Sequence, residues 1–481
     1  MQHLKTRTRL MTLGLLAASS LLLSAGGALA QAPFTTLDDT ASAQIRFSAT
    51  DRGKPILAGS EVAISGQGFR PGQQVTLLYG TAPLPNGALK ADKEGKVEAR
   101  ITLPADAVAG NHPILVVAQG PYSAALANLK VSPDIPLSNQ AGYETKEAEV
   151  ARGLYQSAFS VKNNALFVTS AVGRPPVRQS ELLRLNPDTL EVVARVTPQP
   201  APARQPGAGA TAGGPGGGPA DGGIFAVYGI GVDDVNDTVW VSNSRQNTVA
   251  VYRQSNLSLV KQFAPGTVNH ARDIVVEQDA GKAFVSATFK PEVVVFDTRT
   301  LDVAERIEIP SRVRGGTFSA ASLSLDAVAH RLYVVSNTTS EVAVINTRVN
   351  AVEKVLPVPG ARSAIGVSHD PRTSRIFVAA QGSDNVVVLD GETGAAVATT
   401  LVGAQPLNVV FDPVRRQAFV AVRGSGTVAV LDADGKLVAN LGRAPNANHV
   451  STDGRGTVFA VDKSAGIRQA ESDTVLRIHA R

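Results

Sequence analysis

The sequence contains no cysteine. Disulfide bonds, c-type haem attachment, thiolate-ligated metal sites and lipid attachment through an N-terminal cysteine are therefore excluded. The fold must be stabilised by its hydrophobic core, and a chain of 481 residues is long enough for two or more domains.

A strong excess of charge of either sign is also missing. The chain carries 46 lysine and arginine residues against 41 aspartate and glutamate residues, a net charge of +5. Three of the cations, Lys5, Arg7 and Arg9, begin a predicted export signal, and without them the balance is 43 to 41, or +2. Overall charge therefore does not predict nucleic-acid binding, which only a local cluster of cations could support.

Long hydrophobic runs are confined to the N-terminus. Leu10 to Leu23 is mostly apolar, and Ala28-Leu29-Ala30 gives a small-x-small cleavage pattern before Gln31. This run is shorter than the ~20 residues of a membrane span. Residues 1–30 are predicted to be a cleaved signal peptide, and we expect a periplasmic protein without stable membrane insertion.

Residues 31–44 are predicted to be a leader or linker, and residues 45–133 show short alternating runs separated by turns. Val75 to Tyr79 is one such run, and Asp92 to Lys96 is a hairpin turn. This spacing predicts a small β-sandwich. Gly66 to Gly72, which reads Gly-x-Gly-Phe-x-Pro-Gly, resembles bacterial immunoglobulin-like and IPT-type domains, and we expect positive φ at its glycines.

The remainder, residues 145–481, repeats with a period of roughly 40 residues. Each unit has an apolar strand, an aspartate-centred turn, an aromatic-Val strand, a Val-x-Val strand and a last turn and strand. Four short strands per unit predict a propeller blade, because helical arrays would show 3.6-residue patterning. The aromatic positions are Phe167, Trp240, Phe284, Tyr333, Phe377, Phe419 and Phe459.

Seven units predict a closed ring whose last blade takes a strand from upstream. The final unit ends at Arg481, just after its third strand, and Thr145 to Val150 resembles the outer strand Val352 to Val355 of the fourth unit. We expect Thr145 to Val150 to complete the seventh blade, because closure removes exposed strand edges. Residues 198–223, mostly Pro, Gly, Ala and Gln, are predicted to be a disordered insertion.

The repeats resemble the YVTN-type propeller repeat, of which Trp240-Val241-Ser242-Asn243 is the nearest copy. Over residues 146–481 the chain is similar to the periplasmic YncE-like family, on the evidence of Asn164 to Phe167, Leu185 to Val192 and Asp473 to Ile478. The resemblance implies an export signal, seven blades, no established catalytic residues and an ability to bind single-stranded DNA. The predicted fold is all-β, a seven-bladed β-propeller preceded by a small, immunoglobulin-like β-sandwich.

Blade geometry predicts that arginines gather on one face of the ring. Loops between second and third strands, and between blades, share that face, while aspartate-rich turns share the opposite face. A one-sided positive field suits phosphate or carboxylate groups, but a solvated arginine-rich rim without a ligand is an equally open interpretation. The candidate ligand-binding residues are Arg152, Arg272, Arg314, Arg362, Asn408, Arg423, Arg443 and His449.

Stacking of nucleic-acid bases requires exposed aromatic side chains. The pattern places Tyr155, Phe225, Tyr228 and Phe318 near the face with the candidate arginines. Signals for an enzyme are weak, since no histidine pair has metal-ligand spacing and no Gly-x-Ser-x-Gly motif joins a strand to a helix. We predict no catalytic residue, no metal and no cofactor.

Three functions remain open at this point. The first is an exported, non-catalytic binding or scaffold protein whose arginine-rich face receives an anionic ligand, such as single-stranded DNA, or a protein partner. The second is a lactonase-type hydrolase that uses the propeller channel. The third is a protein–protein scaffold in which the charged face is incidental.

Overall fold

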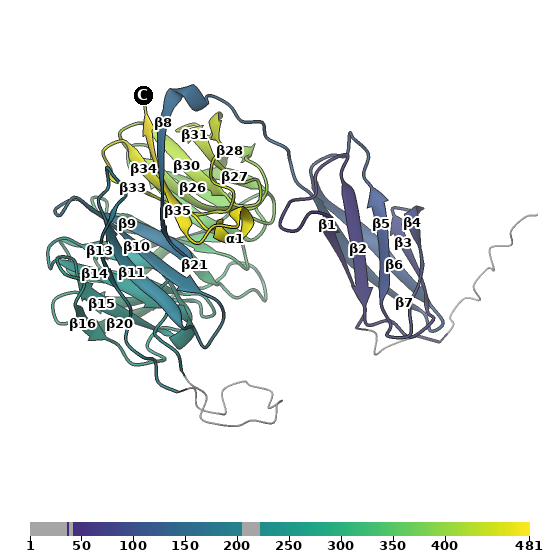
Figure 1. The fold of residues 1–481 in the computed structure, drawn as a ribbon, viewed down its shortest axis with the longest axis horizontal. Coiled ribbons are helices and arrows are strands. Elements are labelled where there is room, and N and C mark those ends of the chain that lie inside the picture. Colours follow the sequence, from purple (N-terminus) through teal and green to yellow (C-terminus); the bar gives the residue numbers. More distant parts are fainter. Residues whose placement is uncertain (1–35, 38–41, 204–221) are drawn as a thin grey trace, which may run out of the picture.

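The computed structural model describes residues 36–37, 42–203 and 222–481. The predicted signal peptide, most of the predicted leader and the larger part of the predicted insertion lie outside the described residues. No helix in the described ranges is long and apolar enough to cross a membrane. Nearly all regular structure is β, and it forms a small sandwich followed by a larger propeller (Figure 1).

The sandwich consists of two antiparallel sheets, ordered β1-β2-β5 and β4-β3-β6-β7. Alternate residues of its strands point inward, so that Val62 and Ile64 of one sheet share a core with Val75 and Leu77 of the other. The strands are β1 (Gln44–Ala49), β2 (Glu61–Gln67), β3 (Gln74–Tyr79), β4 (Ala82–Lys90), β5 (Val97–Thr102), β6 (Gly110–Gln119) and β7 (Ser123–Val131).

The glycine-rich corner after β2 closes one end of this core. Gly68 and Gly72 have φ of +85° and +75°, as the sequence predicts, and Phe69 between them is buried. Gly66 does not have positive φ and is needed for a different reason. A Cβ at Gly66 would lie 2.6 Å from Cγ2 of Val97, so a larger side chain would clash with the core.

The propeller consists of seven four-stranded antiparallel blades. Blades 1 to 3 contain β9 (Leu154–Ser160), β10 (Ala165–Val172), β11 (Gln179–Leu185) and β12 (Val192–Val196); β13 (Ile230–Asp233), β14 (Thr238–Asn243), β15 (Thr248–Arg253) and β16 (Leu259–Gln262); and β17 (Ala271–Glu277), β18 (Lys282–Ala287), β19 (Glu292–Asp297) and β20 (Asp302–Glu308). Blades 4 and 5 contain β21 (Ala320–Asp326), β22 (Arg331–Ser336), β23 (Glu341–Asn346) and β24 (Ala351–Pro357); and β25 (Ala364–Asp370), β26 (Arg375–Ala380), β27 (Asn385–Asp390) and β28 (Ala396–Leu401). Blades 6 and 7 contain β29 (Pro406–Asp412), β30 (Gln417–Val422), β31 (Thr427–Asp432) and β32 (Leu437–Leu441); and β33 (Ala447–Thr452), β34 (Thr457–Asp462), β35 (Asp473–Ala480) and β8 (Tyr143–Ala151). The short helices are η1 (Gln140–Gly142), η2 (Ser244–Gln246) and α1 (Ala465–Arg468).

The ring closes through β8, as the sequence predicts. This strand pairs antiparallel with β35, from Tyr143 opposite Ala480 to Ala151 opposite Asp473. The inner strands β9, β13, β17, β21, β25, β29 and β33 contact their neighbours all the way around the axis. Because N-terminal and C-terminal residues share the seventh blade, no blade is left with an open edge at the junction of the two chain ends.

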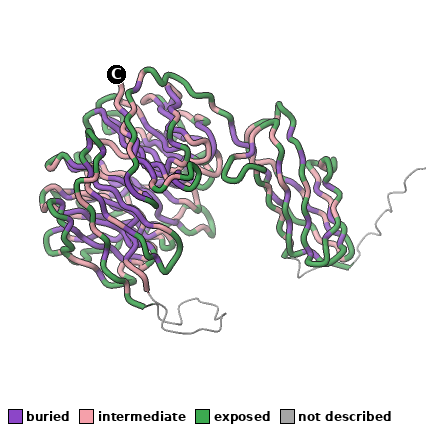
Figure 2. Tube along the Cα trace, viewed as in Figure 1, coloured by how far each residue is buried: buried purple, intermediate pink, exposed green. Residues whose placement is uncertain are grey.

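Burial on both faces explains the composition of the middle strands. Neighbouring blades pack against each other, so β27 and β31 are continuous buried runs rather than alternating ones. The repeated aromatics, such as Trp240 and Phe377, are fully buried between blades. Figure 2 shows this burial along the strands, with exposed residues at the loops. The aspartates that end the inner strands are structural: Asp326 and Asp412 accept backbone N–H bonds within their own turns.

The sandwich contacts blade 5, and the linker that follows it contacts blade 6. Nζ of Lys130 on β7 forms an ion pair of 2.5 Å with Asp384 in the β26–β27 loop, and Nδ2 of Asn111 on β6 donates to Gly382 O at 3.1 Å. The linker then runs along β32, where Ser138 pairs with Asn440. These polar contacts hold the sandwich against blade 5 of the propeller (Figure 1).

Candidate functional site

The propeller has two ends, which differ in how their charges are arranged. We define the first face as the end where every inner strand begins, which also carries the loops between second and third strands. The second face is the end where every inner strand finishes. The axis of the ring opens on the first face, where residues at the starts of the inner strands surround a polar cavity.

This mouth cavity has a volume of about 160 Å³. It brings together four of the predicted residues: Arg272 from β17, Asn408 from β29, Arg423 from the β30–β31 loop and His449 from β33. These residues come from three inner strands and one loop, and they lie up to 177 positions apart in the sequence. They meet because the closed ring places its inner strands around one axis. The remaining lining residues are Tyr155, Gln156, Ser322, Leu407 and Asn448.

Backbone hydrogen bonds hold the polar side chains of the mouth cavity. Oδ1 of Asn408 accepts from Val450 N at 2.9 Å, and Nδ2 of Asn448 donates to Tyr155 O at 2.7 Å. Nδ1 of His449 lies 3.3 Å from Ser157 N and accepts its hydrogen bond, so the ring proton belongs on Nε2. Burial, with a contribution from the charge of Arg272, lowers the pKa of His449 to about 3. His449 is therefore a neutral hydrogen-bond donor at physiological pH.

A second cavity of about 240 Å³ adjoins the first, with Tyr155 lining both. It lies between blades 7, 1 and 2 on the first face, and it contains the predicted Arg152. It also contains Arg245 and Lys463, which the sequence placed on this face without singling them out. The other lining residues are Gly153, Ala171, Val172, Gly173, Tyr228, Ala465, Gly466 and Asp473.

The two cavities together hold five cations: Arg152, Arg245, Arg272, Arg423 and Lys463. Among the described residues, none of these five forms an ion pair with a carboxylate. The single lining carboxylate, Asp473, is buried and accepts three backbone N–H bonds. The two cavities therefore hold five cations against one lining carboxylate, so positive charge is in excess there.

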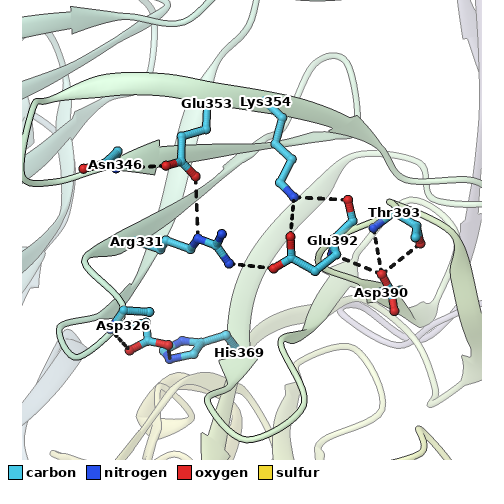
Figure 3. A network of polar contacts seen from close by, with 10 residues as sticks. Asp326, Arg331, Asn346, Glu353, Lys354, His369, Asp390, Glu392 and Thr393 are labelled. Carbon is cyan, nitrogen blue, oxygen red and sulfur yellow. Dashed lines mark hydrogen bonds and ion pairs between the residues drawn. The ribbon is translucent and has the colours of Figure 1, made fainter.

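The second face is organised in the opposite way. Arg331 lies 3.5 Å from Glu353 and 2.6 Å from Glu392, and Lys354 lies 3.2 Å from the same Glu392 (Figure 3). Arg416 pairs with the buried Asp370 at 2.7 Å. These three cations are neutralised by neighbouring carboxylates, unlike the five cations of the two cavities.

No protein-family model matches the chain. The uncharacterised protein YncE of Escherichia coli strain K12 is 25% identical over 286 residues, which cover 57% of this chain and 72% of that protein. YncE of Salmonella typhi is 24% identical over 273 residues and is covered to 68%. The propeller is YncE-like.

Solved structures support the fold of this YncE-like chain at low sequence identity. Virginiamycin B lyase from Staphylococcus aureus superposes with a TM-score of 0.52 at 11% identity, covering 70% of this chain and 100% of the lyase chain. Hydrazine synthase of Kuenenia stuttgartiensis gives a TM-score of 0.52 at 15% identity, with coverages of 68% and 95%. At these identities the likeness concerns the fold alone.

Three of the predicted site residues of the YncE-like propeller lie outside both cavities. Arg314, Arg362 and Arg443 sit on connections between blades and are exposed at the surface of the first face. These connections run from an outer strand at the rim to the next inner strand, and none of the three arginines lines either cavity. Within the described ranges, no group of three or more His, Asp or Glu residues is placed to hold a metal ion.

The prediction of exposed aromatics was wrong for three of four residues. Phe225, Tyr228 and Phe318 are 3%, 6% and 1% exposed, because the segments before inner strands pack between blades. Tyr155 is only partly exposed and lies under Nζ of Lys463. Among the described residues, Phe289 in the β18–β19 loop is an exposed aromatic of the first face; it is 72% exposed, and the sequence pattern did not reveal it.

Proposed function

We propose that the paired cavities on the first face bind an anionic ligand and that the protein acts as a binding protein. The supporting observation is the set of five cations, Arg152, Arg245, Arg272, Arg423 and Lys463, that converge there without carboxylate partners. Arg272, Arg423 and Lys463 are partly buried, whereas Arg152 and Arg245 are exposed. Cations that lie close together repel one another, and an anion that enters relieves this repulsion. Arginine forks and the Nε2–H of His449 suit phosphate or carboxylate oxygens.

Single-stranded DNA is the polymeric form of such a ligand. Its phosphates would contact the arginines of the mouth, and Phe289 on the same face offers a surface on which a base can stack. A small phosphate or carboxylate compound would instead occupy the cavities alone. The proposed place of action is the periplasm, to which the predicted signal peptide would direct the chain.

The arginines of the mouth give the first prediction. Arg272→Ala and Arg423→Ala should each weaken binding of a short labelled oligonucleotide about 10- to 100-fold, because each removes a charge-assisted hydrogen bond. The affinity of the wild-type protein should fall steeply between about 50 and 200 mM salt. Fluorescence anisotropy measures both effects, and unlabelled phosphate and citrate as competitors separate a polymeric ligand from a small one.

Arg362→Ala is the matched control for this experiment. Arg362 is an exposed arginine of the same face that lies outside both cavities, so its loss should change affinity less than about twofold. Equal losses for Arg362 and Arg423 would show diffuse attraction to the whole face and contradict a site at the mouth. Binding that does not respond to salt would contradict an anionic ligand.

A further inference from the structure

Lys463 lines the larger cavity, and hydrogen bonds to its backbone N–H and its backbone carbonyl fix its position. It follows β34, and its backbone N–H donates to Asn446 O at 3.0 Å while its carbonyl accepts from Nδ2 of Asn446 at 2.6 Å. Oδ1 of the same Asn446 accepts from Nε of Arg423 at 2.7 Å. One asparagine therefore aligns the lysine of one cavity with an arginine of the other.

The side chain of Lys463 lies in an unusual electrostatic environment. Its Nζ is 4.9 Å from the centroid of the Tyr155 ring. Burial lowers the pKa of Lys463, the charge of Arg423 and, to a lesser extent, that of Arg245 lower it further, and Asp473 opposes them. A lowered pKa enlarges the neutral, nucleophilic fraction of an amine, and crowding by other cations is a known way to lower it.

The cavity around this amine suits a small molecule with a negative charge. Its volume of about 240 Å³ lies below the range of ~300–1,000 Å³ that holds drug-sized ligands. Arg152 and Arg245 line it beside Lys463 and offer guanidinium groups to a carboxylate. The lining of this cavity therefore contains two arginines that can bind a carboxylate and the amine nitrogen of Lys463.

We propose that Lys463 forms an imine with the carbonyl carbon of a small oxo acid whose carboxylate is held by Arg152 and Arg245, a proposal that rests on anion binding at this face. The neutral amine attacks the carbonyl carbon and the carbonyl electron pair moves to oxygen. One nitrogen proton moves to that oxygen and gives a hydroxyl group. The hydroxyl group takes up a proton and leaves as water while the nitrogen lone pair forms the C=N bond, and the nitrogen releases its second proton. The balance is amine plus carbonyl giving imine plus water, so no oxidant or reductant is needed, and hydrolysis reverses the step.

Reductive trapping tests this assignment on the full chain. The protein is incubated with pyruvate or glyoxylate, reduced with borohydride and digested, and the modified peptides are identified by mass spectrometry. We expect one dominant adduct, on Lys463, with a yield at least about tenfold above that of any other lysine, because the cavity holds the oxo acid beside this amine. Acetone, which has the carbonyl but no carboxylate, should give no preferential adduct.

Lys463→Arg should abolish the dominant adduct, whereas Lys290→Arg should leave it unchanged. Lys290 is an exposed lysine of the first face that lies outside both cavities, and mapping on the wild-type chain makes the result independent of how the variants fold. Equal labelling of Lys290 and Lys463 would overturn the proposal. If pyruvate leaves no adduct while the oligonucleotide still binds in a salt-dependent way, imine formation is refuted and anion binding stands; if the oligonucleotide does not bind either, both fail.

Discussion

Replacing Asp473 with alanine is expected to lower the free energy of unfolding of the propeller by at least about 3 kcal/mol. Both carboxylate oxygens are used: Oδ2 accepts from Gly153 N at 2.6 Å and Leu154 N at 3.1 Å, and Oδ1 accepts from Ala465 N at 2.7 Å. Asp473 is only 2% exposed. Without the carboxylate, three buried N–H groups lose their acceptors, and each unsatisfied donor costs about 1–3 kcal/mol.

The location of Asp473 makes this loss affect the whole ring. It begins β35 of the last blade and binds the backbone that enters β9 of the first blade, directly after the closing strand β8. Gly153 at this junction has φ of +82°, and a Cβ there would lie 2.5 Å from Ala171 O, so no other residue can replace the geometry easily. The carboxylate thus joins the two chain ends of the propeller.

Fluorescence of the single tryptophan measures the effect without interference from the sandwich. Trp240 is fully buried in blade 2, and the chain has no other tryptophan, so its denaturant transition reports on the propeller alone. Asp473→Asn keeps one acceptor oxygen and should lose less stability than Asp473→Ala. A denaturation midpoint for Asp473→Ala equal to that of the wild type would contradict the prediction. It would show that water replaces the carboxylate and that the junction of β35, β8 and β9 does not depend on it.

The blades were predictable because they are local. Each blade is a meander of consecutive strands, so the register of β26 with β27 depends on a short turn and on nearby residues such as Phe377 and Val388. Closure was predictable because the seventh repeat contains only three strands. Its third strand therefore had an unpaired edge, with which Thr145 to Val150 could pair. Both inferences need only strand pattern and the rule that edges must be covered.

The site was only partly predictable because it depends on where loop side chains point. The starts of inner strands necessarily face the axis, which is why Arg272, Asn408 and His449 were found from the repeat. Loop residues follow no such rule: Arg362 is exposed and lines neither cavity, while Lys463, whose backbone is held by Asn446 17 positions earlier, lines the larger one. No repeat pattern encodes that pairing, so only the folded chain reveals it.

His449 is expected to make the propeller lose stability in acid more steeply than its variants do. Its pKa falls from the usual 6.5 to about 3 because of burial and of the charge on Arg272. Above pH 6.5 the imidazole is neutral in both the folded and the unfolded chain and contributes no pH dependence. Between pH 6.5 and 3 only the unfolded chain binds the proton, so stability falls by up to about 1.4 kcal/mol per pH unit.

The comparison with His449→Asn isolates this contribution from other titrating groups. The wild type should lose up to about 3 kcal/mol relative to the variant between pH 7 and pH 4.5, measured by denaturation followed at Trp240. His112→Asn, which changes a histidine on β6 of the sandwich, should leave the pH dependence of the Trp240 transition as it is in the wild type. The prediction is contradicted if the difference in the free energy of unfolding between the wild type and His449→Asn stays constant with pH. That result would show that His449 accepts the proton in the folded chain too.

The same depressed pKa fixes how His449 would act on a ligand. Since Nδ1 accepts from Ser157 N, Nε2–H remains as a donor toward the mouth, and it stays a donor from pH 8 down to well below pH 6. His449 should therefore add no pH dependence to anion affinity between pH 6 and 8, in contrast to a histidine with an ordinary pKa. An affinity that rises about tenfold over that range as pH falls, and that no longer rises in His449→Asn, would mean that a bound anion draws a proton onto the ring.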